Sequence, residues 1–190
     1  MNLKKLSLSL AACTLTASSM CLAATHSEDL PNFKRISNFI STGNAPSLHG
    51  TELLQQRHFG AIVDLRTPSP ATVDEQREVE KLEMSYVALP VGDGIPTEQQ
   101  ITKFIQTVDH APKQMDWYPA VYVHGDKDNG AAASLIAIYH ITHDNWDYKR
   151  ALTDAHKNGL KSDNAALATL IKDYAEGSKK LSKPGEPAVQ

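Results

Sequence analysis

Short apolar runs alternate with amphipathic segments along most of the chain, and this alternation limits the fold more than any other feature of the sequence. The runs AIVDLR, SYVALPV and AVYVHG are typical of strands, and the residues between them place apolar side chains at helical spacing. Parallel strands need such crossover helices, which then cover both faces of the sheet. The sequence therefore predicts an α/β fold with three layers, in which helices flank a mostly parallel central sheet.

The individual elements follow from apolar periodicity and from residues typical of caps and turns. Strands are expected at 33–40, 61–66, 85–91 and 120–125, and helices at 48–59, 73–84, 97–111, 131–144, 147–159 and 162–177. Turn residues are expected to end the first strand after residue 40. Gly60 is expected to end the helix at 48–59. We expect the helix at 73–84 to bury Val73, Val79 and Leu82. The helix at 97–111 should begin at a capping box formed by Thr97 and Gln100, with an apolar stripe made of Ile101, Phe104, Ile105 and Val108.

The first 23 residues have the composition of a secretory signal peptide. Two lysines precede an apolar run that gives way to small residues. Cleavage is expected after Ala23 or Ala24, which predicts a periplasmic or secreted protein. In the alternative interpretation, the sequence Leu-Ala-Ala-Cys that ends at Cys13 is a lipoprotein box and Cys13 carries a lipid anchor.

Cysteine content and charge exclude several classes of function. The only two cysteines, Cys13 and Cys21, lie in the signal segment, so the mature chain has no thiolate nucleophile. Loss of Lys4 and Lys5 with that segment lowers the formal net charge from −3 to −5. Nucleic-acid binding is not expected, because there is no basic stripe to neutralise a phosphate backbone. No later run is long and apolar enough to span a bilayer, and no cofactor is expected.

The order of several segments resembles that of a known family. The segments NFISTGNAPS, GAIVDLR, ALPVGDGIP, VYVHG and NWDYKRALTDAHKNGL follow one another as in the cysteine-dependent dual-specificity and tyrosine phosphatases, and most closely as in their secreted bacterial branch. The resemblance covers residues 32–176, which are therefore expected to form one phosphatase-like domain. Residues 177–190 remain as a polar C-terminal tail.

The resemblance also indicates where catalytic groups would lie. In that family a histidine and a nucleophilic cysteine are followed, five residues later, by an arginine that grips the phosphate, within a loop of converging backbone amides. Here His124 matches the histidine and Asp93 the general acid, but Gly125 stands at the cysteine position and Ala131 at the arginine position. The loop that would bind a ligand comprises His124, Gly125, Asp126, Lys127, Asp128, Asn129, Gly130 and Ala131. The resemblance thus implies a pseudophosphatase that binds an unidentified protein or small anion.

The charges of this loop do not favour a bound phosphate. Asp126 and Asp128 would repel it, and Lys127 offsets only one of these two charges. We hypothesise that one of the two aspartates folds into the hollow and takes the place of the phosphate, because carboxylates are good ligands for amides at a helix N-terminus. In the alternative, both carboxylates face solvent, and Asp128 or Asn129 caps the following helix.

A hydrolase with altered, metal-assisted chemistry is the alternative function, with Asp93, Asp126, Asp128 and a nearby histidine as its candidate ligands. No metal site is assigned, however. His140 and His143 lie three residues apart on one helix and could share a metal, but a partly exposed helix surface explains them equally well.

Two further residues near the loop receive structural roles. His124 is expected to hydrogen-bond the loop backbone, as the resemblance implies. Arg66, at the end of a buried strand, is expected to pair with an acid such as Glu78 or Glu80, and the alternative is a ligand-binding role near the edge of the site.

Overall fold

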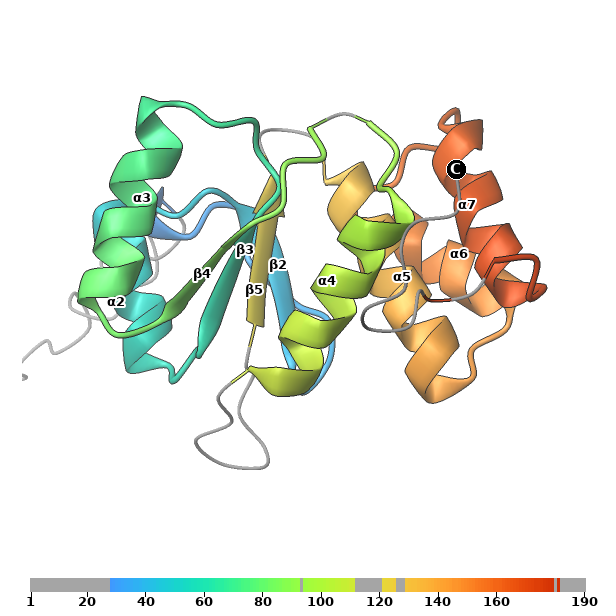
Figure 1. The fold of residues 1–190 in the computed structure, drawn as a ribbon, viewed down its shortest axis with the longest axis horizontal. Helices are drawn as coiled ribbons and strands as arrows, with labels where there is room; N and C mark the ends of the chain where they lie inside the picture. Colours follow the sequence, from blue (N-terminus) through green and yellow to red (C-terminus); the bar gives the residue numbers. More distant parts are fainter. Residues whose placement is uncertain (1–27, 93, 112–120, 126–128, 180, 182–190) are drawn as a thin grey trace, which may run out of the picture.

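A five-stranded sheet forms the centre of the molecule (Figure 1). The computed structural model describes residues 28–92, 94–111, 121–125, 129–179 and 181. The strands are β1 (Lys34–Arg35), β2 (Ile40–Asn44), β3 (Ala61–Asp64), β4 (Ser85–Ala88) and β5 (Val121–Gly125), arranged in the order β1-β2-β5-β3-β4. β1 runs antiparallel to β2, and all other neighbouring strands are parallel.

Helices cover both faces of this sheet, as Figure 1 shows. The helices are α2 (Leu48–Gln56), α3 (Pro70–Lys81), α4 (Glu98–His110), α5 (Gly130–Asp144), α6 (Tyr148–Lys157) and α7 (Ala165–Ala175). α2 and α3 lie on one face, and α4 and α5 lie on the other, where α6 and α7 pack against α5. The predicted three-layer α/β fold with a mostly parallel sheet is confirmed. None of the helices in the described part of the chain has the length and apolar character needed to cross a membrane.

Alternating side chains of β5 divide the core into two parts. Val121 and Val123 belong to the larger apolar cluster with α4, α5 and α7, whereas Tyr122 packs with α2 and α3. Successive residues of a strand point to opposite faces, so a fully buried strand contributes to both layers. Burial on both faces explains why this strand reads as a continuous apolar run.

Capping hydrogen bonds of Thr97 and Ser69 fix where two of the helices begin. Thr97 and Gln100 form the predicted capping box at the start of α4, and the predicted stripe of Ile101, Phe104, Ile105 and Val108 is buried. Ser69 caps α3 in the same way, with Pro70 in its first turn. α3 therefore begins three residues earlier than the sequence pattern predicted.

The prediction for the buried face of α3 was partly wrong. Val79 is fully buried, but Val73 is 52% exposed, and the inward-facing residues besides Val79 are Thr72 and Glu75. The apolar pattern missed this face because a carboxylate occupies one of its positions. That carboxylate has a buried cationic partner, described below.

The prediction for the first strand and for the end of α2 also differed from the structure. Residues 41–44, expected to form a turn, belong to β2 and pair with β5. Gly43 is needed there for close packing, because a Cβ atom would lie 2.9 Å from the carbonyl oxygen of Pro31 and would also overlap the Tyr122 hydroxyl. α2 ends before Gly60, and His58 rather than a glycine adopts the left-handed conformation after it, with φ of 62°.

Candidate functional site

The ends of β3 and β5 meet at the carboxyl edge of the sheet, where ligands bind in open α/β folds. Asp64 and His124 are register partners on these strands, and the backbone N–H of Leu65 donates to the carbonyl oxygen of His124 at 2.9 Å. Gly125 ends β5, and the connection to α5 follows it. The last residues of β3 and β5 therefore lie side by side at the edge of the sheet where the predicted ligand-binding loop begins.

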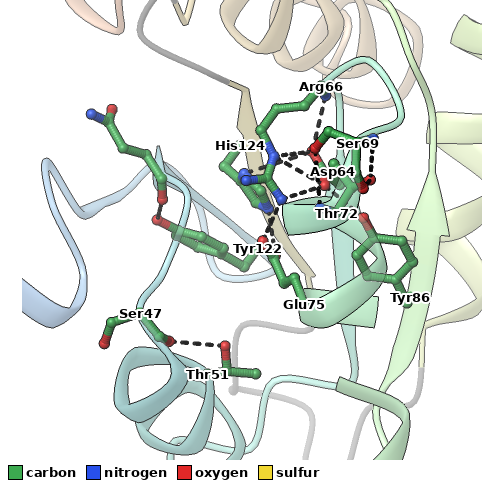
Figure 2. A network of polar contacts seen from close by, with 11 residues as sticks. Ser47, Thr51, Asp64, Arg66, Ser69, Thr72, Glu75, Tyr86, Tyr122 and His124 are labelled. Atoms are coloured by element: carbon green, nitrogen blue, oxygen red, sulfur yellow. Dashed lines mark hydrogen bonds and ion pairs between the residues drawn. The ribbon is translucent and has the colours of Figure 1, made fainter. Parts of the chain in front are cut away.

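Arg66 joins two buried carboxylates at this edge (Figure 2). Its Nε donates to Asp64 Oδ1 at 2.9 Å, and its Nη2 donates to Asp64 Oδ2 at 2.7 Å and to Glu75 Oε2 at 2.5 Å. Arg66 therefore pairs with acids, as expected, but its partners are Asp64 and Glu75, and the suggestion of Glu78 or Glu80 was wrong. Glu75 is the acidic residue on the buried face of α3, whereas Glu80 is exposed.

His124 is enclosed by the same carboxylates. Its side chain is fully buried, its Nε2 lies 2.8 Å from Glu75 Oε1, and its Nδ1 lies 3.9 Å from Asp64 Oδ1. Within the described part of the chain, Nδ1 has no hydrogen-bond partner. The hydrogen bond that the structure describes for this side chain therefore goes to Glu75 of α3, and the expected bond to the loop backbone stays a prediction, because residues 126–128 lie outside the described part of the chain.

Tyr86 completes the network from β4. Its hydroxyl donates to Asp64 Oδ2 at 2.6 Å. Burial raises the pKa of the Tyr86 hydroxyl well above its ordinary value, and its hydrogen bond to the Asp64 carboxylate raises it further. The phenol consequently remains a hydrogen-bond donor throughout the physiological pH range.

Asp64 is held in its ionised form by these neighbours. Burial alone would raise the pKa of its carboxyl group, but hydrogen bonds from Arg66, the charge of His124 and the hydrogen bond from Tyr86 outweigh burial. The pKa of Asp64 therefore lies below its ordinary value of 3.8. Folding and ionisation of this carboxyl group are linked as a result.

The structure describes part of the predicted ligand-binding loop. Gly125 ends β5, and Ala131 lies in the first turn of α5 with 5% of its surface exposed. Asn129 is the N-cap residue of α5, but its side chain makes no capping hydrogen bond, so of the two residues named in the alternative only Asp128 remains as a candidate cap. Asp93, Asp126, Lys127 and Asp128 lie outside the described residues, and the predictions for them stay predictions.

His140 and His143 have separate partners on α5 and its surroundings. His140 is buried, stacks on Trp146 with ring centroids 4.2 Å apart, and contacts Asp144. His143 stacks on Tyr139 and lies 3.3 Å from Asp109. These contacts favour the structural interpretation of the histidine pair over a shared metal.

Sequence reasoning missed Asp64, Glu75 and Tyr86 as members of the site. Asp64 and Glu75 together with His124 offer ligand atoms that lie within 4.8 Å of one another, and all three residues are buried. Asp64 could have been found, because a carboxylate in the apolar run AIVDLR requires a buried partner. Glu75 could not, because the charged pattern of α3 does not show which of its acids faces the sheet.

We predict that the Asp64→Asn variant is less stable at pH 7 by about 3 kcal/mol, because removing one member of a buried ion pair leaves its partner uncompensated. The pKa of Asp64 is lower in the folded than in the unfolded state. Its ionisation therefore stabilises the wild-type fold above pH 3.8, and this contribution is lost as the pH falls further, through the folded pKa. Denaturant unfolding between pH 2 and pH 7 should show a smaller acid-side loss of stability in the variant.

Asp74→Asn is the matched control for this experiment, because Asp74 forms an exposed ion pair with Arg77 on the same helix that carries Glu75. Its effect should stay below about 0.5 kcal/mol. Equal effects of the two substitutions, or an unchanged acid-side slope for Asp64→Asn, would contradict the role assigned to Asp64.

Comparison with solved structures finds the same fold in several phosphatases. Tk-PTP is 16% identical with a TM-score of 0.64, and the match covers 78% of this chain and 97% of Tk-PTP. PTPMT1 is 20% identical with a TM-score of 0.64, and the match covers 76% of this chain and 94% of PTPMT1. TpbA of P. aeruginosa is 17% identical with a TM-score of 0.58, and the match covers 78% of this chain and 85% of TpbA. At these identities the likeness establishes the fold alone.

The comparison with curated proteins finds no match. A family model described as "DSP-PTPase phosphatase fused to NAD+ Kinase" matches residues 17–173, which is most of the chain. This match agrees with the β5–α5 arrangement and with the resemblance read from the sequence segments. The chain belongs to this family of dual-specificity phosphatase-like domains.

Proposed function

We propose that this chain is an exported, phosphatase-like protein that does not hydrolyse phosphoesters and acts by binding a protein or a small anion at the carboxyl edge of its sheet. One observation carries the proposal: β5 runs from His124 directly into Gly125, and the chain has no cysteine after Cys21. Thiol-dependent phosphoryl transfer needs a thiolate that attacks phosphorus, and glycine has no side chain to supply one.

The start of α5 supports the same conclusion. The methyl group of Ala131 cannot hold two phosphate oxygens as a guanidinium does. Ser134 is the described hydroxyl residue closest in sequence to this position. It is fully buried and donates to the carbonyl oxygen of Ala131 at 2.8 Å, within its own helix. It is therefore unsuited to replace the missing nucleophile.

The class of ligand is suggested by structures with the same fold. TpbA has been crystallised in complex with phosphotyrosine, and PTPMT1 in complex with PI(5)P. The present chain has a strand and a following helix at the same sheet edge, so a phosphorylated small molecule or a phosphorylated protein segment is the ligand we propose. Because Asp126 and Asp128 would repel a phosphate, such a ligand requires both carboxylates to point away from it, and its binding would rule out the hypothesis that one of them fills the hollow. Binding at such an edge relies on backbone amides and the N-terminus of the following helix, and neither requires the lost side chains.

A metal-assisted phosphomonoester hydrolase is the second candidate, and the cluster of Asp64, Glu75 and His124 is the observation that favours it. A catalytic metal needs an open position for water or substrate. These three side chains are at most 8% exposed, and Arg66 binds both carboxylates. Their enclosure makes binding the better supported function.

We predict that the mature protein releases no more p-nitrophenol from p-nitrophenyl phosphate than buffer does, with or without Mg²⁺, Mn²⁺ or Zn²⁺. The physical reason is the absence of both the nucleophile and the guanidinium that stabilises the transition state. Asp93→Asn should leave this background unchanged, since a general acid contributes nothing without a preceding attack.

The Gly125→Cys/Ala131→Arg double variant is the positive control, because it restores both groups on the same fold. We expect it to hydrolyse the substrate in a reaction that iodoacetate blocks. Turnover by the wild-type protein above background, whether dependent on metal or not, would contradict the proposal.

Export rests on the first 23 residues. We predict that the full chain, expressed in a Gram-negative host, is processed and appears in the osmotic-shock fraction. Its mass should be that of a chain starting at Ala24 or Thr25, because signal peptidase cleaves after small residues. A version lacking residues 1–23 is the control and should stay in the cytoplasm. Full-length mass in the cytoplasmic fraction would contradict export, and membrane retention with a lipid on Cys13 would favour the alternative cleavage.

A further inference from the structure

Three side chains of the type that bind transition metals converge from different elements at the carboxyl edge of the sheet. Asp64 comes from β3, Glu75 from α3 and His124 from β5. Each offers one ligand atom, and these atoms lie within 4.8 Å of one another in a buried site. Imidazole and carboxylate together suit Zn²⁺ and related divalent ions.

The positively charged guanidinium of Arg66 lies between the two carboxylates of this cluster (Figure 2). Its Nη2 atom lies 2.7 Å from Asp64 Oδ2 and 2.5 Å from Glu75 Oε2. A zinc ion binds carboxylate oxygens at about 2.0–2.2 Å. The two carboxylates would therefore have to approach such an ion by only about half an ångström each to bind it at the place of Nη2.

The cluster contains one unsatisfied polar atom beside its ion pairs. The two carboxylates contact the Arg66 guanidinium, and they also lie within 3.9 Å of the ring nitrogens of His124. However, the Nδ1 atom of His124 lacks a hydrogen-bond partner among the described residues, although this side chain is fully buried and Nδ1 faces Asp64 Oδ1 at 3.9 Å. This buried imidazole nitrogen is an observation independent of the carboxylates, and it points to a further cationic ligand between these groups.

We propose that Asp64, Glu75 and His124 form a binding site for a divalent transition-metal ion, with Arg66 as a built-in competitor for the same carboxylates. A divalent ion would replace the positive charge of the guanidinium and any proton on the imidazole, and it would give the unpartnered ring nitrogen the ligand bond that Arg66 does not supply. The Arg66 side chain is the most exposed of the four at 12%, so it can leave toward solvent when the ion enters.

The surroundings would orient the ligands of such an ion. The Tyr86 hydroxyl donates to Asp64 Oδ2 at 2.6 Å, and the backbone N–H of Arg66 donates to Asp64 Oδ1 at 2.9 Å. Hydrogen bonds of this kind fix the direction of a metal-binding carboxylate. The site ties β3, β5 and α3 together, and the proposal holds whether or not the domain binds a phosphorylated ligand.

The test is a Co²⁺ titration of the metal-free full mature chain, followed by visible d–d absorption and by calorimetry for stoichiometry. We expect wild-type protein to bind one Co²⁺ weakly. Arg66→Met removes the competing charge while keeping a long apolar stem, and it should bind Co²⁺ at least about tenfold more tightly. Adding Glu75→Gln to that variant should weaken binding at least about tenfold, as loss of a ligand does.

His143→Asn is the matched control for adventitious binding, since His143 also lies close to a carboxylate, that of Asp109, but outside the cluster. It should leave affinity and stoichiometry unchanged. The proposal is overturned if Arg66→Met binds no more tightly than wild type, if Glu75→Gln has no effect, or if His143→Asn abolishes the signal. Should Arg66→Met fail to fold without metal, refolding in Zn²⁺ is expected to rescue its circular dichroism spectrum, and a lack of rescue would equally overturn the proposal.

Discussion

The guanidinium of Arg66 lies between Asp64 and Glu75 and links the sheet to α3. It thereby fixes the side chains at the edge of the sheet where the candidate site lies. Through Glu75 the same network reaches His124, the second-last residue of β5. Tyr86 adds a bond from the edge strand β4. Buried charges are tolerated only when each has partners, so the positions of these five side chains depend on one another. Any ligand bound at the carboxyl end of β5 would therefore lie next to this network.

Much of the architecture could be predicted, because its causes are local in the sequence. The alternation of apolar runs with amphipathic segments gave the sheet and its covering helices, and the capping box at Thr97 located the start of α4. The failures concern side chains whose placement is decided by distant partners. The sequence alone does not show whether Val73 or Glu75 lies on the buried face of α3. The position of Arg66, which pairs with Glu75, decides it. Gly43 looked like a turn residue because its actual constraint, the approach of Pro31 and Tyr122, is invisible in the local sequence.

The residues of the candidate site also fall into those that the local sequence identifies and those that only distant contacts bring there. His124, Gly125 and Ala131 were placed at the β5–α5 junction by their order alone, and the structure has them there. Asp64, Glu75 and Tyr86 come from three other elements, and only the fold brings them to His124. The chain has a dual-specificity phosphatase-like domain, but glycine and alanine stand where the resemblance places the cysteine and the arginine. Our proposal of binding without catalysis rests on these two replacements, because backbone amides can bind an anion without either side chain.

Binding without turnover is the central claim, and one titration tests both halves of it. Isotopically labelled mature protein would be titrated with a phosphotyrosine peptide while amide shifts and the ³¹P spectrum are recorded together. The account predicts saturable shifts of the amides of Gly125 and of residues 129–131, with the phosphoester signal unchanged throughout. Appearance of inorganic phosphate, or amides at the β5–α5 junction that do not respond to the peptide, would contradict it.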